Sequence, residues 1–160
     1  MISPAARMAA HLKGRNVPEL ACLAKITPRQ AANAIKGRPV ATIPFMRLAV
    51  AAGFDPMPDL PHAPTAISDF DFDVLAIAFR IKRDINQHTE RAAAKASGLS
   101  LASISRIENA HFVSVQVVIT ACRYLGVHVF GYLTAAPYPP ISRVPPTETS
   151  LGARDWGRYE

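Results

Sequence analysis

Residues 89–110, TERAAAKASGLSLASISRIENA, decide the expected fold of this chain. Small residues before the turn let two helices cross closely, and Gly98 can adopt the positive φ with which a chain leaves a helix. Ser100 can cap the next helix through its hydroxyl, and Ile104 and Ile107 lie on one apolar face of that helix. The pattern predicts two short helices joined by a tight turn, a layout that lays its second helix along a DNA major groove.

This stretch also carries a family resemblance. The run Gly98-Leu99-Ser100, followed by SISRIE at 103–108, resembles the Xre/Cro/lambda-repressor-like family. The flanks agree, because 70–85 would be the first helix of that family and 114–125 its fourth. The resemblance covers Asp69 to Leu133 and implies an all-α, DNA-binding domain of four to five short helices.

The order of helix signals in this segment occurs a second time, earlier in the chain. Three pairs of boundary residues lie 73 positions apart: Thr27 and Ser100, Gly37 and Ala110, and Gly53 and Gly126. The same interval places Ala31 on Ile104, Ala34 on Ile107, Met46 on Ile119 and Arg7 on Arg80. The sequence therefore predicts two tandem helix-turn-helix domains, with a chance match of helical segments as the alternative.

Helix signals in the first half give the expected boundaries. A helix is expected over 2–13, and Asn16 with Glu19 has the spacing of a capping box for a helix over 18–25. Thr27-Pro28-Arg29-Gln30 is a second capping-box pattern, for a helix that ends before Gly37. A further apolar helix is expected over 42–52.

Proline-rich segments separate the expected domains. Four prolines within 55–64 and five after Ala135 disfavour helix, so we expect domains at 1–56 and 69–134, a linker at 57–68 and a tail at 135–160. The tail is rich in aromatic residues. It is either a free end or a strap that packs on a domain or a partner through Trp156 and Arg158.

Charge favours the first half as the one that binds DNA. The whole chain carries +6, and residues 1–60 account for eight Lys or Arg against three acids. Residues 61–135 carry seven against six, and the tail three against three. Because phosphate contacts supply most nonspecific DNA affinity, we expect the first domain to make more of them.

The expected recognition helix of the first domain carries base-reading side chains. Arg29 can bond guanine bidentately, and Gln30 and Asn33 can bond adenine. Lys36 and Arg38 suit phosphates, and Thr27 begins the segment. The alternative is that these residues form a solvated helix face.

The second recognition helix departs from the family pattern. Leu101 and Ala102 cannot hydrogen-bond a base edge but can touch a thymine methyl, and Ser103 is ambiguous. Thr89 and Arg106 are candidate phosphate contacts, against capping and surface packing respectively, and Ser100 caps the helix.

No signal for catalysis or for a metal appears in the sequence. The five histidines lack ligand spacing, and no phosphate loop or nucleophile motif occurs, so we expect no enzyme, no cofactor and no membrane span. Cys22 and Cys122 are expected to be reduced core residues. We expect Glu108 to pair with an arginine of the preceding first helix, such as Arg80.

Together these signals predict a cytoplasmic transcriptional regulator, a repressor of a bacterium or its mobile element, that binds double-stranded DNA and forms a homodimer. The alternative is a protein-binding module, an antiactivator or antitoxin-like regulator. Its contact surface would include Leu101, Ala102, Val115 and Val118.

Overall fold

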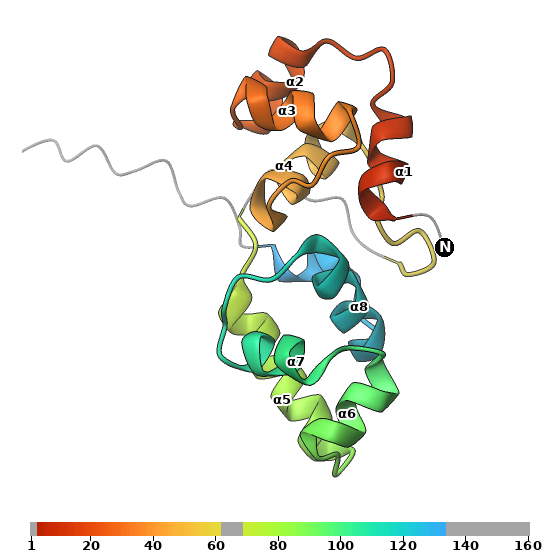
Figure 1. Cartoon of the computed structure of the whole chain (residues 1–160), viewed down its shortest axis with the longest axis vertical. Helices are drawn as coiled ribbons and strands as arrows, with labels where there is room; N and C mark the ends of the chain where they lie inside the picture. Colours follow the sequence, from red (N-terminus) through yellow and green to blue (C-terminus); the bar gives the residue numbers. More distant parts are fainter. Residues whose placement is uncertain (1–2, 62–68, 134–160) are drawn as a thin grey trace, which may run out of the picture.

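The structure, a computed structural model, describes residues 3–61 and 69–133 and is all-α over them. Figure 1 shows two clusters of four helices stacked end to end. The first contains α1 (Pro4–His11), α2 (Val17–Ala24), α3 (Pro28–Ile35) and α4 (Thr42–Ala52). The second contains α5 (Phe72–Ile85), α6 (Glu90–Ser97), α7 (Leu101–Glu108) and α8 (Val115–Leu125), followed by a 3₁₀ turn, η1 (Val129–Tyr132).

Side-chain caps begin most of these helices. The predicted capping box at α3 is confirmed, because Thr27 accepts from the backbone of Gln30 while the Gln30 side chain accepts from the backbone of Thr27. The box predicted at Asn16 is wrong, since the Asn16 side chain makes no cap hydrogen bond. Pro18, at the second position of α2, has no N–H, which leaves the N–H of Glu19 as the donor that a cap by Asn16 would need.

The last three helices of the two clusters repeat at the interval of 73. The bounds of α2, α3 and α4 coincide with those of α6, α7 and α8, with lengths of 8, 8 and 11 residues. The backbone repeats as well, because each non-glycine residue with positive φ has a glycine at the equivalent position. The pairs are Lys25 and Gly98, Gln87 and Gly14, and Ala110 and Gly37.

The first helices do not keep this interval. Helix α1 runs from Pro4 to His11 and has 8 residues, whereas α5 runs from Phe72 to Ile85 and has 14. Arg7 and Arg80, which the interval of 73 pairs, also have different surroundings. Arg7 is half-buried and donates to two backbone carbonyls after α4, whereas Arg80 lies on the exposed side of α5.

Ion pairing in the second cluster also differs from the expectation. Glu108 is buried and accepts from Nε of Arg83 at 2.6 Å, while Arg80 donates to the backbone carbonyl of Glu108. The predicted side-chain pair of Glu108 with Arg80 is thus replaced by one with Arg83. The hydrogen bond to Glu108 raises the pKa of the Arg83 guanidinium above its usual value.

The packed core extends beyond the boundary expected for the first domain. Met57 is completely buried, and Leu60 packs against the core, although both lie in the expected linker. The rest of that linker, 62–68, and the expected tail, 135–160, lie outside the described residues.

The two clusters contact each other through equivalent segments. Helix α4 packs against α8, and Nε2 of His128 lies 2.9 Å from Oδ1 of Asp55, exactly one repeat interval away in sequence. Two cavities, of about 280 and 350 Å³, lie between the clusters. Residues 39–40 and 114–116 line the first, and their equivalents 112–113 and 41–43 line the second.

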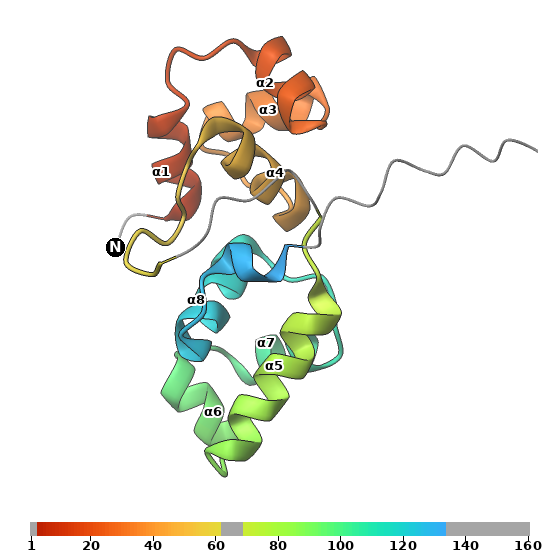
Figure 2. The same ribbon diagram turned by 180° about the vertical axis from the view of Figure 1, so that it is seen from behind.

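This reciprocal pattern is that of a two-fold, isologous interface formed within one chain. In Figure 1, α1 and α5 lie at opposite corners of the molecule, and so do α2 and α6. Figure 2 shows the same diagonal arrangement from behind.

Candidate nucleic-acid interface

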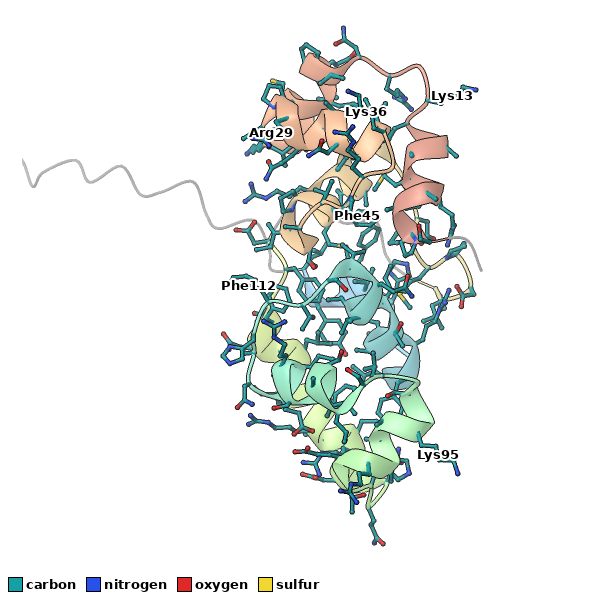
Figure 3. The ribbon with its side chains drawn as sticks, in the orientation of Figure 1. Lys13, Arg29, Lys36, Phe45, Lys95 and Phe112 are labelled. Atoms are coloured by element: carbon teal, nitrogen blue, oxygen red, sulfur yellow. The ribbon has the colours of Figure 1, made fainter. Side chains whose placement is uncertain are left out.

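Helix α3 presents polar side chains outward from a small buried face. Ala31 and Ala34 are buried, which leaves Arg29 exposed and Asn33 half-buried on the remaining sides. Lys36 follows the helix directly, and Figure 3 shows Arg29 and Lys36 on the outside of the first cluster. The buried alanines give close packing, and the outward face remains open to a ligand.

The first cluster carries several unpaired cations. Among the described residues of the first cluster, six exposed cations take part in no ion pair: Lys13, Arg15, Lys25, Arg29, Lys36 and Arg38. Sequence reasoning singled out only the last three of them, although the charge count of residues 1–60 already contained the signal. A concentration of unpaired cations suits a polyanion.

Gln30 is less available than the sequence suggested. Its Oε1 accepts from the backbone N–H of Thr27 at 2.9 Å and from the Thr27 hydroxyl at 3.1 Å. Because a bidentate bond to adenine needs both the oxygen and the nitrogen of the amide, the capping box leaves only the Gln30 nitrogen for a base. The Asn33 side chain makes no hydrogen bond to another residue in the part of the chain that the structure describes.

Helix α7 has a less polar outward face. Leu101 is exposed, as are Ala102 and Arg106, while Ser103 is half-buried and bonds the Ser100 hydroxyl at 2.9 Å. The Arg106 side chain has no hydrogen bond or ion pair to another described residue, and Arg106 lines the larger cavity between the clusters. The α7 face thus offers one unpaired cation and an apolar tip.

Thr89 and Ser100, the two remaining predicted DNA contacts, cap their helices. Thr89 accepts from the backbone N–H of Ala92 at 3.2 Å, and Ser100 accepts from that of Ser103 at 3.1 Å. Both are exposed at the starts of their helices. Each of these hydroxyl groups therefore has a structural role as a helix cap. Its hydrogen could in addition donate to a phosphate.

Three other sequence expectations change. Val115 and Val118 are buried, so they cannot belong to the apolar contact surface of a protein-binding module. Cys22 is exposed because it lies on the outer side of α2, whereas Cys122 is buried as expected. Burial raises the pKa of the Cys122 thiol to about 12.

Searches for other kinds of site cover only the described ranges. Within 3–61 and 69–133, no group of three or more His, Cys, Asp or Glu residues is placed to hold a metal ion. In the same ranges, no helix has the length and apolar character needed to cross a membrane.

A comparison with protein families identifies the type of domain that the second cluster forms. Residues 77–131, from within α5 to η1, match the model of a helix-turn-helix family. The second cluster is an Xre/Cro-like helix-turn-helix domain. This family match covers less than half of the chain. No curated protein and no solved structure matches the chain.

This helix-turn-helix domain contains α6, the turn at Gly98 and α7, in the order predicted from the sequence. Domains of this family are typical of DNA-binding regulators that are not enzymes. The match does not include α1–α4, whose resemblance to the domain consists of the helix bounds and backbone angles described above.

Proposed function

We propose that this chain is a sequence-specific DNA-binding transcriptional regulator, a repressor, that uses both helical clusters as helix-turn-helix domains. The observation that carries the proposal is the repetition of the helix-turn-helix geometry, at an interval of 73, in a cluster with six exposed and unpaired cations. Localisation in the bacterial cytoplasm, on the nucleoid, follows from this function.

In the proposed complex, α3 reads bases in one major groove. Arg29 bonds guanine, and Asn33 bonds adenine through its free amide. Lys36 and Arg38 bind the flanking phosphates, with Thr27 at the groove edge. These roles are supported by the exposure of the cations and by the absence of internal partners for them among the described residues.

Helix α7 would enter a second groove with less base discrimination. Leu101 and Ala102 can contact thymine methyl groups, and Arg106 can contact a phosphate. In this arrangement the starts of α6 and α7, which carry Thr89, Ser100 and Ser103, would face the DNA backbone. The pseudo-two-fold arrangement supports a site with two half-sites, one read by each cluster of a single chain. A homodimer would then cover a longer palindrome.

The test is fluorescence anisotropy with DNA from upstream of the gene and with scrambled DNA, at several salt concentrations. We expect the specific DNA to bind about a thousandfold or more tighter, with affinity that falls steeply as salt rises. Arg29→Ala and Asn33→Ala should each cost roughly 10- to 100-fold on the specific DNA. Lys95→Ala removes an exposed charge on α6, away from the proposed surface, and serves as the control.

Equal and weak binding to both DNAs would reject the proposal and favour the protein-binding module. That alternative now depends on exposed apolar residues such as Leu101, because Val115 and Val118 are buried. An unchanged specific affinity in both α3 variants would reject the role of that helix alone.

A further inference from the structure

Helix α5 carries an uncovered apolar stripe along its outer face. Val74, Ile77, Ile81 and Ile85 are 48%, 57%, 52% and 73% exposed. Their spacing of three and four residues places them on one side of the helix, which is about 21 Å long. We call these four residues the α5 stripe.

The stripe is not required by the helix-turn-helix architecture. The equivalent first helix of the other cluster, α1, exposes only Ala6, Ala10 and His11 on its outer side. Four branched side chains in a row on a surface helix leave a continuous apolar patch, a feature that marks a contact surface.

The first cluster shows how the chain after a fourth helix can cover a first helix. After α4, Arg7 of α1 donates to the carbonyls of Asp55 and Pro56 at 3.2 and 3.3 Å, and His11 bonds the carbonyl of Ala52. Met57, in this same segment, is completely buried. The chain that leaves α4 therefore packs along the first helix of its own cluster, as η1, which follows α8, packs against α5 in the second cluster.

In the second cluster the chain after α8 is brought to the start of α5. The backbone N–H of Asp71 donates to the carbonyl of Tyr132 at 2.8 Å, and Phe70 and Leu133 form an antiparallel bridge. The described chain therefore ends at Leu133, which lies beside Phe70, just before the start of α5 and of the α5 stripe. Residues 134–160 could span roughly 85 Å if extended, several times the length of α5.

The sequence of this continuing segment suits an apolar surface. Its large apolar and aromatic residues are Tyr138, Ile141, Val144, Leu151, Trp156 and Tyr159. It carries three basic and three acidic residues, so no net charge opposes its contact with an uncharged stripe. A tethered segment acts at an effective concentration of the order of millimolar, which favours it over a separate molecule.

We propose that residues 134–160 cover the α5 stripe of their own chain, with Trp156 packed against it. The segment would act as an intramolecular strap on the outer face of the helix-turn-helix domain. This inference does not depend on DNA binding.

Trp156 is the single tryptophan of the chain, so its fluorescence reports on the proposed contact directly. The experiment measures quenching of the full-length protein by acrylamide and compares it with N-acetyltryptophanamide. We expect Trp156 to be shielded in the wild type and the quenching constant to rise several-fold in the Ile77→Ser/Ile81→Ser variant. Phe112→Ser, at a residue that is 74% exposed on the α7–α8 loop, should leave it unchanged.

Three outcomes would overturn the proposal: quenching of the wild type equal to that of the free compound, no change in the double variant, or an equal change in Phe112→Ser. Shielding that disappears on dilution would assign the stripe to a second copy of the chain instead. Circular dichroism checks the helix content, and Ile85→Ser, at the most exposed position of the stripe, replaces the double variant if that variant unfolds.

Discussion

One of the hydrogen bonds between the two clusters gives a quantitative prediction. Thr42, at the start of α4, is 4% exposed, and its hydroxyl donates to the carbonyl of Val113 on the α7–α8 loop at 2.6 Å. Thr42→Val keeps the shape of the side chain and removes the donor. A buried acceptor left without a partner costs about 1–3 kcal/mol, and because Val113 is half-buried we expect about 1–2 kcal/mol.

The measurement is the free energy of unfolding from urea titrations followed by circular dichroism. Thr120→Val is the matched control, because the Thr120 hydroxyl donates to the carbonyl of Gln116 within α8, at 2.8 Å. The control should change stability by no more than about 0.5 kcal/mol. Equal losses in the two variants, or a loss below about 0.5 kcal/mol in Thr42→Val, would refute the assignment of this bond to the interface between the clusters.

Three further predictions use the same titrations. Glu108→Ala removes the partner of Nε of Arg83, while Nη1 of Arg83 keeps its bond to the carbonyl of His88 and its pairing with Asp84. Because the guanidinium keeps these partners and is 23% exposed, we expect a loss of about 1–2 kcal/mol, below the cost in a fully buried pair; a loss under about 0.5 kcal/mol would contradict this. Ala110→Gly removes the strain of φ 54° and should stabilise the protein by roughly 0.5–1 kcal/mol, whereas Gly37→Ala, at the equivalent position, should destabilise it by a similar amount; the same sign in both would refute the equivalence. The pKa of Cys122 is raised to about 12 by burial, so above about pH 9 the folded state holds a proton that the unfolded state loses. Stability should be unaffected by this thiol below that pH and fall by up to about 1.4 kcal/mol per unit above it, and Cys122→Ala should show a shallower fall; identical pH profiles would exclude the effect.

Local signals in the sequence predicted much of the helix order. Thr27, Asp71 and Ser100 cap their helices because a short polar side chain before a helix satisfies a free backbone N–H. Gly53 and Gly126 end theirs in the left-handed conformation. The failure at Asn16 shows the limit of such rules, because a spacing that permits a capping box does not ensure that its hydrogen bonds form.

Tertiary relations were harder to predict because they depend on which face each helix buries. Cys22 and Cys122 both lie in apolar stretches, yet only Cys122 faces the core. The partner of Glu108 was placed on the correct helix but at the wrong residue, Arg80 in place of Arg83, since one helical turn separates the two. The contact between the two clusters was not predicted from the sequence. The residues that form it lie at equivalent positions of the two clusters, but their residue types differ.

The central claim is that one chain reads two half-sites. The direct measurement is a hydroxyl-radical footprint on the DNA from upstream of the gene, combined with native mass spectrometry of the complex. We predict one chain per duplex and two protected segments on one face, about one helical turn or 10–10.5 base pairs apart, of which only one is lost in Arg29→Ala. A single protected segment per chain, or two segments that appear only when two chains are bound, would contradict the claim.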